Sequence, residues 1–162
     1  MRAITYSFLA CAVLLGACAT TSEEQKPAPT VDLTARSGDN AAMLKDPNNI
    51  LSRRSVYFDY DKFDVKDEYR KLVEAHAQFL KANPSAKMLI QGNADERGSR
   101  EYNVGLGQRR SDSVKKMLTL LGARDDQIES VSLGEEKPVC TAASEDCYAK
   151  NRRGDMLYNG EY

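Results

Sequence analysis

The sequence has no excess of charge of either sign, and this limits the partners that it can bind. Among its 162 residues, Lys and Arg number 23 and Asp and Glu number 24, which leaves a formal net charge of −1. A general electrostatic affinity for nucleic acid requires a clustered basic excess, because Lys and Arg must neutralise the phosphates. We therefore expect no nucleic-acid partner, and we expect local geometry to provide any selectivity.

Histidine is nearly absent, since His76 is the only one in the chain. Zinc sites are built from several Cys, His and carboxylate ligands, so a single histidine disfavours a zinc centre. His76 falls within the apolar stripe of a predicted helix, and we interpret it as a partly buried, hydrogen-bonded side chain. The sequence also shows no nucleophile beside a base. We therefore expect neither an enzyme nor a bound cofactor.

The apolar run near the N-terminus is too short to cross a membrane as a helix. It spans residues 8–15, whereas a transmembrane helix takes about 20 apolar residues. Arg2 gives the segment a positive start, and this combination is typical of a secretory signal peptide. We expect the chain to be exported.

Leu15-Gly16-Ala17-Cys18 follows this run and resembles a lipobox, with a Leu three residues before a Cys and two small residues between them. The resemblance implies that the Cys18 thiol is acylated and that residues 1–17 are removed as a signal peptide. Cys11 is a weaker alternative, because the apolar run before it would be truncated. Ala19 stands where an Asp is associated with retention in the inner membrane, so we expect an outer-membrane anchor that faces the periplasm.

The segment after the lipobox has the composition of a tether. Residues 18–50 are rich in Thr, Ser, Pro, Asp, Asn and Lys, and their apolar residues follow no period. Such a segment buries too little apolar surface to offset the entropy of folding. We predict a flexible tether at 18–50 and one folded domain at 51–162.

Strands and helices alternate in the predicted domain. Period-two patterns indicate strands at 55–60, 87–91, 130–133 and 153–158. Helical spacing indicates helices from residue 69 to a stop at Asn83-Pro84, from about 100 to 121, and at 145–151. This order predicts a single α/β (α+β) sandwich, with helices packed on one face of a small mixed β-sheet.

Two further cysteines, Cys140 and Cys147, lie in a polar segment of an exported chain. Thiols in an oxidising compartment usually pair, so we expect a disulfide between them. A redox-active pair would favour the closer Cys-x-x-Cys spacing beside a helix start.

Arg110 falls in the middle of the apolar stripe of the predicted helix at 100–121, and its neighbour Arg109 falls at the edge. Burial of an unpaired guanidinium costs several kcal/mol, so Arg110 should need an anion. Asp95, in the loop 92–98, is the candidate. One hypothesis is a salt bridge that only fixes the loop. The other is a zwitterion site, in which Asp95 accepts an ammonium and Arg110 binds a carboxylate with two hydrogen bonds.

A run from Gly92 to Arg110 carries the resemblance to a known family, namely Gly92-Asn93-Ala94-Asp95-Glu96-Arg97-Gly98 continuing into Leu106-Gly107-Gln108-Arg109-Arg110. Further matches lie at 56–61, 131–138 and 151–153. Together they cover about residues 55–158. The chain resembles the OmpA-like domain family, and within it most closely the peptidoglycan-associated lipoproteins.

The resemblance implies non-covalent binding of the peptide stem of peptidoglycan, through the free amino-acid end of meso-diaminopimelate. By position, it makes Asp95 and Arg110 the principal site residues. The more loosely assigned contacts are the flanking residues Arg97 and Leu106 and the pocket-lining residues Phe58 and Asp59. Asn93 stands where the family often has His, and we expect this change to alter detail without loss of binding.

The resemblance also implies partners and a cellular role. It predicts contact with TolB and other Tol proteins, and a link from outer membrane to cell wall that supports envelope integrity and cell division. We interpret Asn151-Arg152-Arg153 as mostly structural, although Arg152 could help to hold the ligand end of the sheet. The alternative is a structural or protein-interaction lipoprotein in which Asp95 and Arg110 form only a salt bridge.

Overall fold

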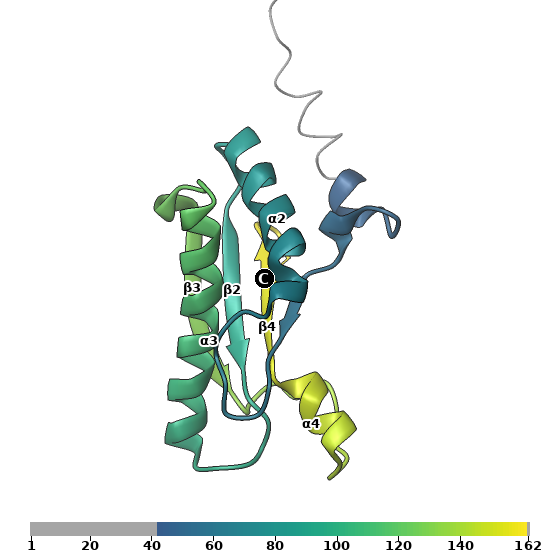
Figure 1. The fold of residues 1–162 in the computed structure, drawn as a ribbon, viewed down its shortest axis with the longest axis vertical. Helices are drawn as coiled ribbons and strands as arrows, with labels where there is room; N and C mark the ends of the chain where they lie inside the picture. The colour runs from purple at the N-terminus through teal and green to yellow at the C-terminus, as the bar shows by residue number, and fades with distance from the viewer. Residues whose placement is uncertain (1–41, 162) are drawn as a thin grey trace, which may run out of the picture. The chain divides into compact units, whose positions relative to one another are not determined.

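The computed structural model describes residues 42–161 (Figure 1). The predicted signal peptide, the lipidation site Cys18 and most of the predicted tether lie outside the described residues. Residues 42–45 are helical, and Leu44 packs against the core. Residues 42–50, which we assigned to the tether, therefore include a part of the folded domain.

A four-stranded mixed sheet forms the centre of the domain, with the order β1-β4-β2-β3. Strands β2 and β3 are parallel, whereas β4 pairs antiparallel with both β1 and β2. The strands are β1 (Ser55–Tyr57), β2 (Met88–Asn93), β3 (Ile128–Gly134) and β4 (Arg153–Tyr158).

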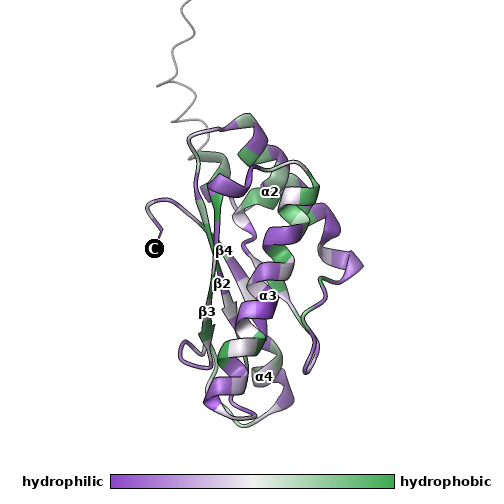
Figure 2. Cartoon of the chain, turned by 90° about the vertical axis from the view of Figure 1, so that its left-hand side faces the viewer, coloured by the Kyte–Doolittle hydropathy of each residue, from purple (hydrophilic) through white to green (hydrophobic). Residues whose placement is uncertain are grey.

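Two long helices cover one face of this sheet, as Figure 2 shows. They are α2 (Arg70–Ala82) and α3 (Arg100–Leu120), while the short helix α4 (Glu145–Asn151) lies beyond the end of the sheet where β2 finishes (Figure 1). The predicted α/β sandwich is thus confirmed. Within residues 42–161, no helix is long and apolar enough to span a bilayer.

Three strands end at other residues than predicted. Strand β3, predicted at 130–133, runs to Gly134. Strand β1 stops at Tyr57 and not at residue 60, because the chain then turns, with Asp61 in the left-handed region at a φ of 56°. Strand β2 does not end at Gln91 but continues through Gly92 to Asn93, since both residues pair with β3.

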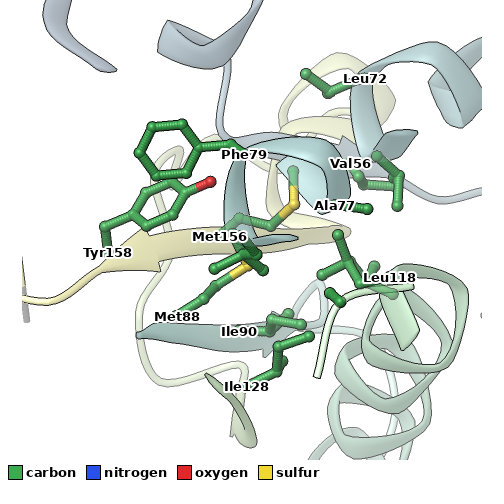
Figure 3. Packing of buried hydrophobic residues seen from close by; sticks show 14 of the residues in the cluster. Val56, Leu72, Ala77, Phe79, Met88, Ile90, Leu118, Ile128, Met156 and Tyr158 are labelled. Atoms are coloured by element: carbon green, nitrogen blue, oxygen red, sulfur yellow. The ribbon is translucent and has the colours of Figure 1, made fainter. Parts of the chain in front are cut away.

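The core lies between the sheet and the helices α2 and α3 (Figure 3). It includes His76, which has no exposed surface. Its Nε2 lies 2.8 Å from the carbonyl oxygen of Arg53, which can only accept, so Nε2 carries the proton. Its Nδ1 then accepts from the Tyr158 hydroxyl at 2.9 Å. The prediction of a hydrogen-bonded core histidine is confirmed, with burial complete.

The two chain ends of the domain are joined by Arg54. Its guanidinium donates to the Leu44 carbonyl at 3.0 Å and to the Glu161 carboxylate at 2.7 Å. Glu161 also accepts from the main-chain N–H of Tyr158 at 2.8 Å. The last residues, for which the sequence offered no interpretation, thus fasten the end of β4 to the segment that enters β1.

The predicted disulfide is confirmed. Cys140 and Cys147 are bonded, with Cα atoms 5.2 Å apart. The side chain of Asn151 holds the same loop, because its oxygen accepts from the N–H groups of Val139 and Cys140 and its nitrogen donates to the Cys140 carbonyl. Loop 139–144 and α4 therefore form one braced unit.

Burial lowers the pKa of His76 from 6.5 to about 4, despite the hydrogen bond to Arg53. The unfolded chain therefore takes up a proton between these values while the folded chain does not, so stability falls as the pH falls through this window. We expect a loss of about 2 kcal/mol between pH 7 and pH 5. Urea unfolding at both pH values measures it. His76→Gln should remove most of this slope, and an equally steep slope in the variant would contradict the assignment.

Loss of the disulfide should destabilise the domain by relaxing the unfolded chain. For a loop with a sequence separation of 7, the chain-entropy model gives about 2.5 kcal/mol. The double variant Cys140→Ser, Cys147→Ser should show this loss in urea unfolding. A reductant should lower the stability of the wild-type protein and leave that of the double variant unchanged. Equal stability of the wild type and the double variant in the absence of reductant would show that Asn151 suffices to hold the loop.

Candidate functional site

A close contact between two glycines places α3 on the sheet. A Cβ atom on Gly92 of β2 would lie 1.8 Å from the carbonyl oxygen of Gly107 in α3. Only glycine at this position lets the backbones of strand and helix approach so closely. At its start, α3 is capped by Ser99, whose hydroxyl accepts from the N–H of Tyr102 at 3.2 Å. The helix is thereby fixed over the end of β2, with Arg110 one turn beyond the contact.

Arg110 is completely buried, as its position in the apolar stripe predicted, while Arg109 is exposed. Its guanidinium donates to three main-chain carbonyls, from Nε to Lys62 at 2.9 Å, from Nη1 to Asn93 at 2.8 Å and from Nη2 to Asp59 at 3.2 Å. Burial lowers the pKa of Arg110 to about 10, so the group remains a cation at neutral pH.

The expected anion is therefore not what satisfies Arg110. Within residues 42–161, Asp95 forms ion pairs with two other arginines and not with Arg110. Neutral carbonyl oxygens can accept from guanidinium N–H groups without cancelling the charge. The hypothesis of a direct Asp95–Arg110 salt bridge is wrong for this structure.

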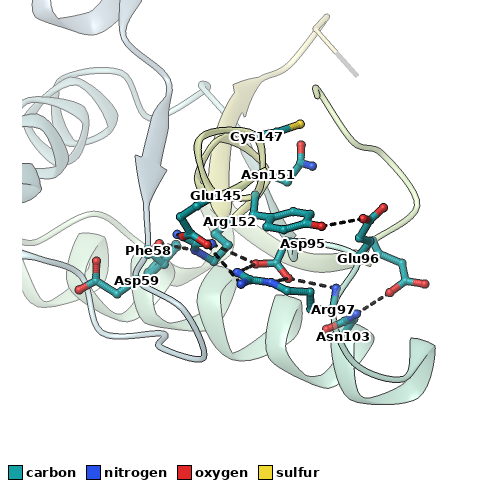
Figure 4. A network of polar contacts seen from close by, with 12 residues as sticks. Phe58, Asp59, Asp95, Glu96, Arg97, Asn103, Glu145, Cys147, Asn151 and Arg152 are labelled. Carbon is teal, nitrogen blue, oxygen red and sulfur yellow. Dashed lines mark hydrogen bonds and ion pairs between the residues drawn. The ribbon is translucent and has the colours of Figure 1, made fainter. Parts of the chain in front are cut away.

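Asp95, which is 4% exposed, lies in the loop after β2 and receives hydrogen bonds from Arg97 and Arg152 (Figure 4). Burial alone would raise the pKa of this carboxyl, but the bonds from Arg97 and Arg152 outweigh burial and lower the pKa below its usual value. Asp95 is therefore ionised at neutral pH.

Arg97 contacts two aromatic rings. The centre of its guanidinium is 4.3 Å from the ring centroid of Tyr60 and 4.4 Å from that of Tyr148. It also forms an ion pair with Glu145 of α4 at 3.2 Å. About a third of the side chain stays exposed, so Arg97 covers Asp95 from the solvent side.

Arg152 joins three segments of the site. It donates to the Phe58 carbonyl at 3.1 Å, to Asp95 at 3.1 Å and to Glu145 at 2.7 Å. The side chain is 6% exposed. This agrees with the structural role that we assigned to Asn151-Arg152-Arg153 and extends it to the site itself, because Arg152 orients the Asp95 carboxylate.

A small pocket with a cavity volume of about 20 Å³ lies between these groups. This is far below the roughly 300–1,000 Å³ of a typical small-molecule site, so the pocket fits no more than the end of a ligand. Its lining residues are Tyr60, Asp61, Asp95, Arg97, Tyr102, Leu106, Arg110 and Arg152.

Four of the six predicted site residues line this pocket, namely Asp95, Arg97, Leu106 and Arg110. Phe58 and Asp59 do not line it. The ring of Phe58 lies under the guanidinium of Arg110, 5.3 Å away, and the carboxylate of Asp59 pairs with Lys66 at 2.7 Å.

The segment after β1 contributes Tyr60 and Asp61 to the pocket instead, and the sequence analysis missed both as site residues. Tyr102 was also missed; its hydroxyl donates to the Asp61 carboxylate. The match at 56–61 could have pointed to Tyr60 and Asp61. The turn that brings them to the pocket, however, depends on the φ of Asp61, which no residue pattern specified.

The charges of the pocket favour an anionic group. Three guanidinium groups, those of Arg97, Arg110 and Arg152, line it together with two carboxylates, those of Asp95 and Asp61. Because Arg97 and Arg152 already pair with Asp95, the charge of Arg110 faces the pocket without an ion-pair partner among the described residues. Those residues also contain no cluster of His, Cys, Asp and Glu that could hold a metal ion.

Comparison with known proteins identifies relatives of the whole domain. A family model described as the OmpA family matches residues 57–152. A peptidoglycan-associated lipoprotein of Pasteurella multocida is 47% identical over 104 residues, covering 64% of this chain and 69% of the relative. One of Pseudomonas putida is 38% identical over 152 residues, covering 91% of each.

Solved structures share the fold. The crystal structure of the peptidoglycan-associated lipoprotein from Burkholderia pseudomallei is similar with a TM-score of 0.71 and 52% identity, covering 72% of this chain and 98% of that chain. The C-terminal domain of Helicobacter pylori MotB is similar with a TM-score of 0.61 at 18% identity, covering 65% and 84%. The second likeness concerns the fold alone.

Gly92→Ala should separate α3 from β2, because the added methyl group would overlap the Gly107 carbonyl. We expect a loss of about 3 kcal/mol in stability, measured by urea unfolding. Gly105→Ala is the matched control, since the only atom near its Cβ is Nη1 of Arg109 at 3.7 Å. Because alanine favours a helix more than glycine does, this change should raise the free energy of unfolding by about 0.5–1 kcal/mol. Similar stabilities of the two variants would contradict the proposed role of the glycine contact.

Proposed function

The chain belongs to the OmpA family, and within it to the peptidoglycan-associated lipoproteins, and on this premise we propose that its domain binds peptidoglycan without catalysis. The ligand group is the free amino-acid end of meso-diaminopimelate in the peptide stem. Asp95 binds its ammonium and Arg110 its carboxylate, while Leu106 packs beside it. Arg97 lies next to Asp95 at the pocket entrance.

One observation carries this proposal, the buried and uncompensated charge of Arg110. Three of the five N–H donors of its guanidinium bind carbonyls, so one donor on each terminal nitrogen remains for a ligand. A carboxylate that accepts both gains two charge-assisted hydrogen bonds in a site shielded from water. The carbonyls and the ring of Phe58 hold the guanidinium in place before the ligand arrives, which reduces the entropy cost of binding.

The ammonium of the same amino acid requires an anion nearby, and Asp95 supplies it across a pocket that Arg110 also lines. A ligand with only one of the two charges would use half of the site. This explains why a free amino-acid end, with both charges on one carbon, fits better than a simple acid or amine.

We further propose that acyl chains on Cys18 anchor the protein in the outer membrane and that the tether lets the domain reach the cell wall. The lipobox supports the anchor, as do relatives named as lipoproteins. Multiple acyl chains hold a protein durably where one chain would not. The partners proposed besides peptidoglycan are TolB and other Tol proteins, on the strength of the resemblance, with envelope integrity and cell division as the processes served.

Co-sedimentation with purified sacculi tests the wall-binding proposal, with the full protein extracted in detergent. Asp95→Asn keeps the size of the side chain but removes its negative charge. Arg110→Lys keeps the positive charge but removes the bidentate geometry of the guanidinium. We expect each to weaken binding by about tenfold or more, in line with the 1.5–3 kcal/mol of a charged hydrogen bond. Arg109→Lys changes the exposed neighbour and should pellet like the wild type. Circular dichroism checks the fold of each variant.

Three outcomes of this experiment contradict the proposal in different ways. Wild-type protein that stays soluble would favour a structural or protein-interaction lipoprotein without a wall ligand. Folded variants that pellet like the wild type would place the wall-binding site away from Asp95 and Arg110. Soluble fragments released from the sacculi would indicate an enzyme.

A further inference from the structure

The carboxylate of Asp95 has no free position for a ligand. Its Oδ1 accepts from the main-chain N–H of Arg97 at 3.1 Å and from Nε of the same residue at 3.2 Å. Its Oδ2 accepts from Nη2 of Arg97 at 2.7 Å and from Nη1 of Arg152 at 3.1 Å. A carboxylate has about four acceptor positions. An incoming ammonium can therefore bind Asp95 only if one of these donors leaves.

Arg152 is poorly placed to leave. Its side chain is 6% exposed, and it also donates to the Phe58 carbonyl and to Glu145. Moving it would break three interactions in a buried place and would release the contact between the segment after β1 and α4. The loss of buried hydrogen bonds to a charged group is expensive.

Arg97 can leave at a smaller cost than Arg152. Its side chain is 33% exposed and starts from a loop, next to Gly98 with a φ of 116°. Outside the Asp95 contact it has other partners, the exposed Glu145 at 3.2 Å and the rings of Tyr60 and Tyr148. A guanidinium that slides between two rings keeps its cation–π contacts while it gives up a carboxylate.

We propose that the side chain of Arg97 occupies, in the ligand-free protein, the place on Asp95 that the ligand ammonium takes, so that Arg97 is an internal competitor of the ligand. The inference rests on the proposed function. Binding then begins at Arg110, which lines the inner wall of the pocket with two unused N–H donors, and is completed when the ammonium replaces the Arg97 side chain on Asp95. Arg152 and the main-chain N–H of Arg97 stay on the carboxylate throughout and keep it oriented.

This exchange limits how much the ligand ammonium adds to binding. Because one cation replaces another on Asp95, the charge next to this buried carboxylate is conserved and no uncompensated anion appears. A ligand with a carboxylate but no ammonium can bind Arg110 yet leaves Arg97 in place. The ammonium thus adds only the difference between its own bond to Asp95 and that of Arg97, which limits both the affinity for the ligand and the preference for a ligand with an ammonium.

Calorimetric titration of the full protein with the tripeptide L-Ala-γ-D-Glu-meso-diaminopimelate tests the inference. Arg97→Ala should bind this peptide about tenfold more tightly than the wild type, since the competitor is gone. Arg97→Lys keeps a cation near Asp95 and should lie between the two. Arg109→Ala removes an exposed arginine that does not line the pocket and should bind like the wild type. Unfolding curves confirm that each variant is folded.

A second peptide, in which the terminal amino group is absent and the carboxylate is kept, sharpens the test. The ratio of the affinity for the first peptide to that for the second should be larger in Arg97→Ala than in the wild type. In the variant, Asp95 binds the ammonium of the first peptide without first losing Arg97. In the wild type, the Nε–H resonance of Arg97 in nitrogen-edited NMR should shift on binding of the first peptide and not of the second.

The outcomes separate this inference from the proposed function. If Arg97→Ala binds more weakly than the wild type or equally well, Arg97 is a direct contact or a bystander, and the competitor role is overturned while the site stands. If the wild-type protein binds neither peptide, the proposed function fails. If Arg97→Ala binds both peptides more tightly by the same factor, the gain comes from easier access and not from exchange on Asp95, which also overturns the inference.

Discussion

The contact between Gly92 and Gly107 is the constraint on which the site depends. It brings α3 so close to β2 that the guanidinium of Arg110 reaches the carbonyl at the end of that strand. From the same place it also reaches the carbonyls of Asp59 and Lys62 in the turn after β1. Arg110 therefore holds the turn, and the turn carries Tyr60 and Asp61 to the pocket. A methyl group at the glycine contact would move α3 away from β2. Because Arg110 belongs to α3 and holds the turn, the positions of Arg110, Tyr60 and Asp61 would all change.

Two opposite charges lie in this small region without neutralising each other. Arg110 is held by neutral carbonyls, and Asp95 is held by the two arginines Arg97 and Arg152. The protein stabilises each charge with partners that leave part of it available, at Arg110 through unused N–H donors and at Asp95 through a partner that can be exchanged. A direct bridge between Asp95 and Arg110 would use the donors and acceptors that a ligand needs.

The sequence predicted those features that depend on the type and spacing of side chains. The burial of Arg110 followed from its place in a helical stripe, the disulfide from two cysteines in an exported chain, and the alternation of strands and helices from their periods. The partners of Arg110 could not be predicted, because main-chain carbonyls carry no residue-type signal. The pairing of Asp95 with Arg152 joins residues 57 positions apart, and the turn at Asp61 depends on one left-handed dihedral angle. Both are products of the assembled fold.

The contacts of Arg54 have a mechanical consequence for a force that reaches the domain through residues 42–50. Residues 42–50 lie at one end of the sheet and α4 at the other (Figure 1), so a force applied through residues 42–50 would cross the length of the sheet before it reached the pocket. Because Arg54 binds both the Leu44 carbonyl and Glu161, such a force enters β1 and the end of β4 together. The two antiparallel strands are then loaded as a pair, and their hydrogen bonds do not open one by one from a free end.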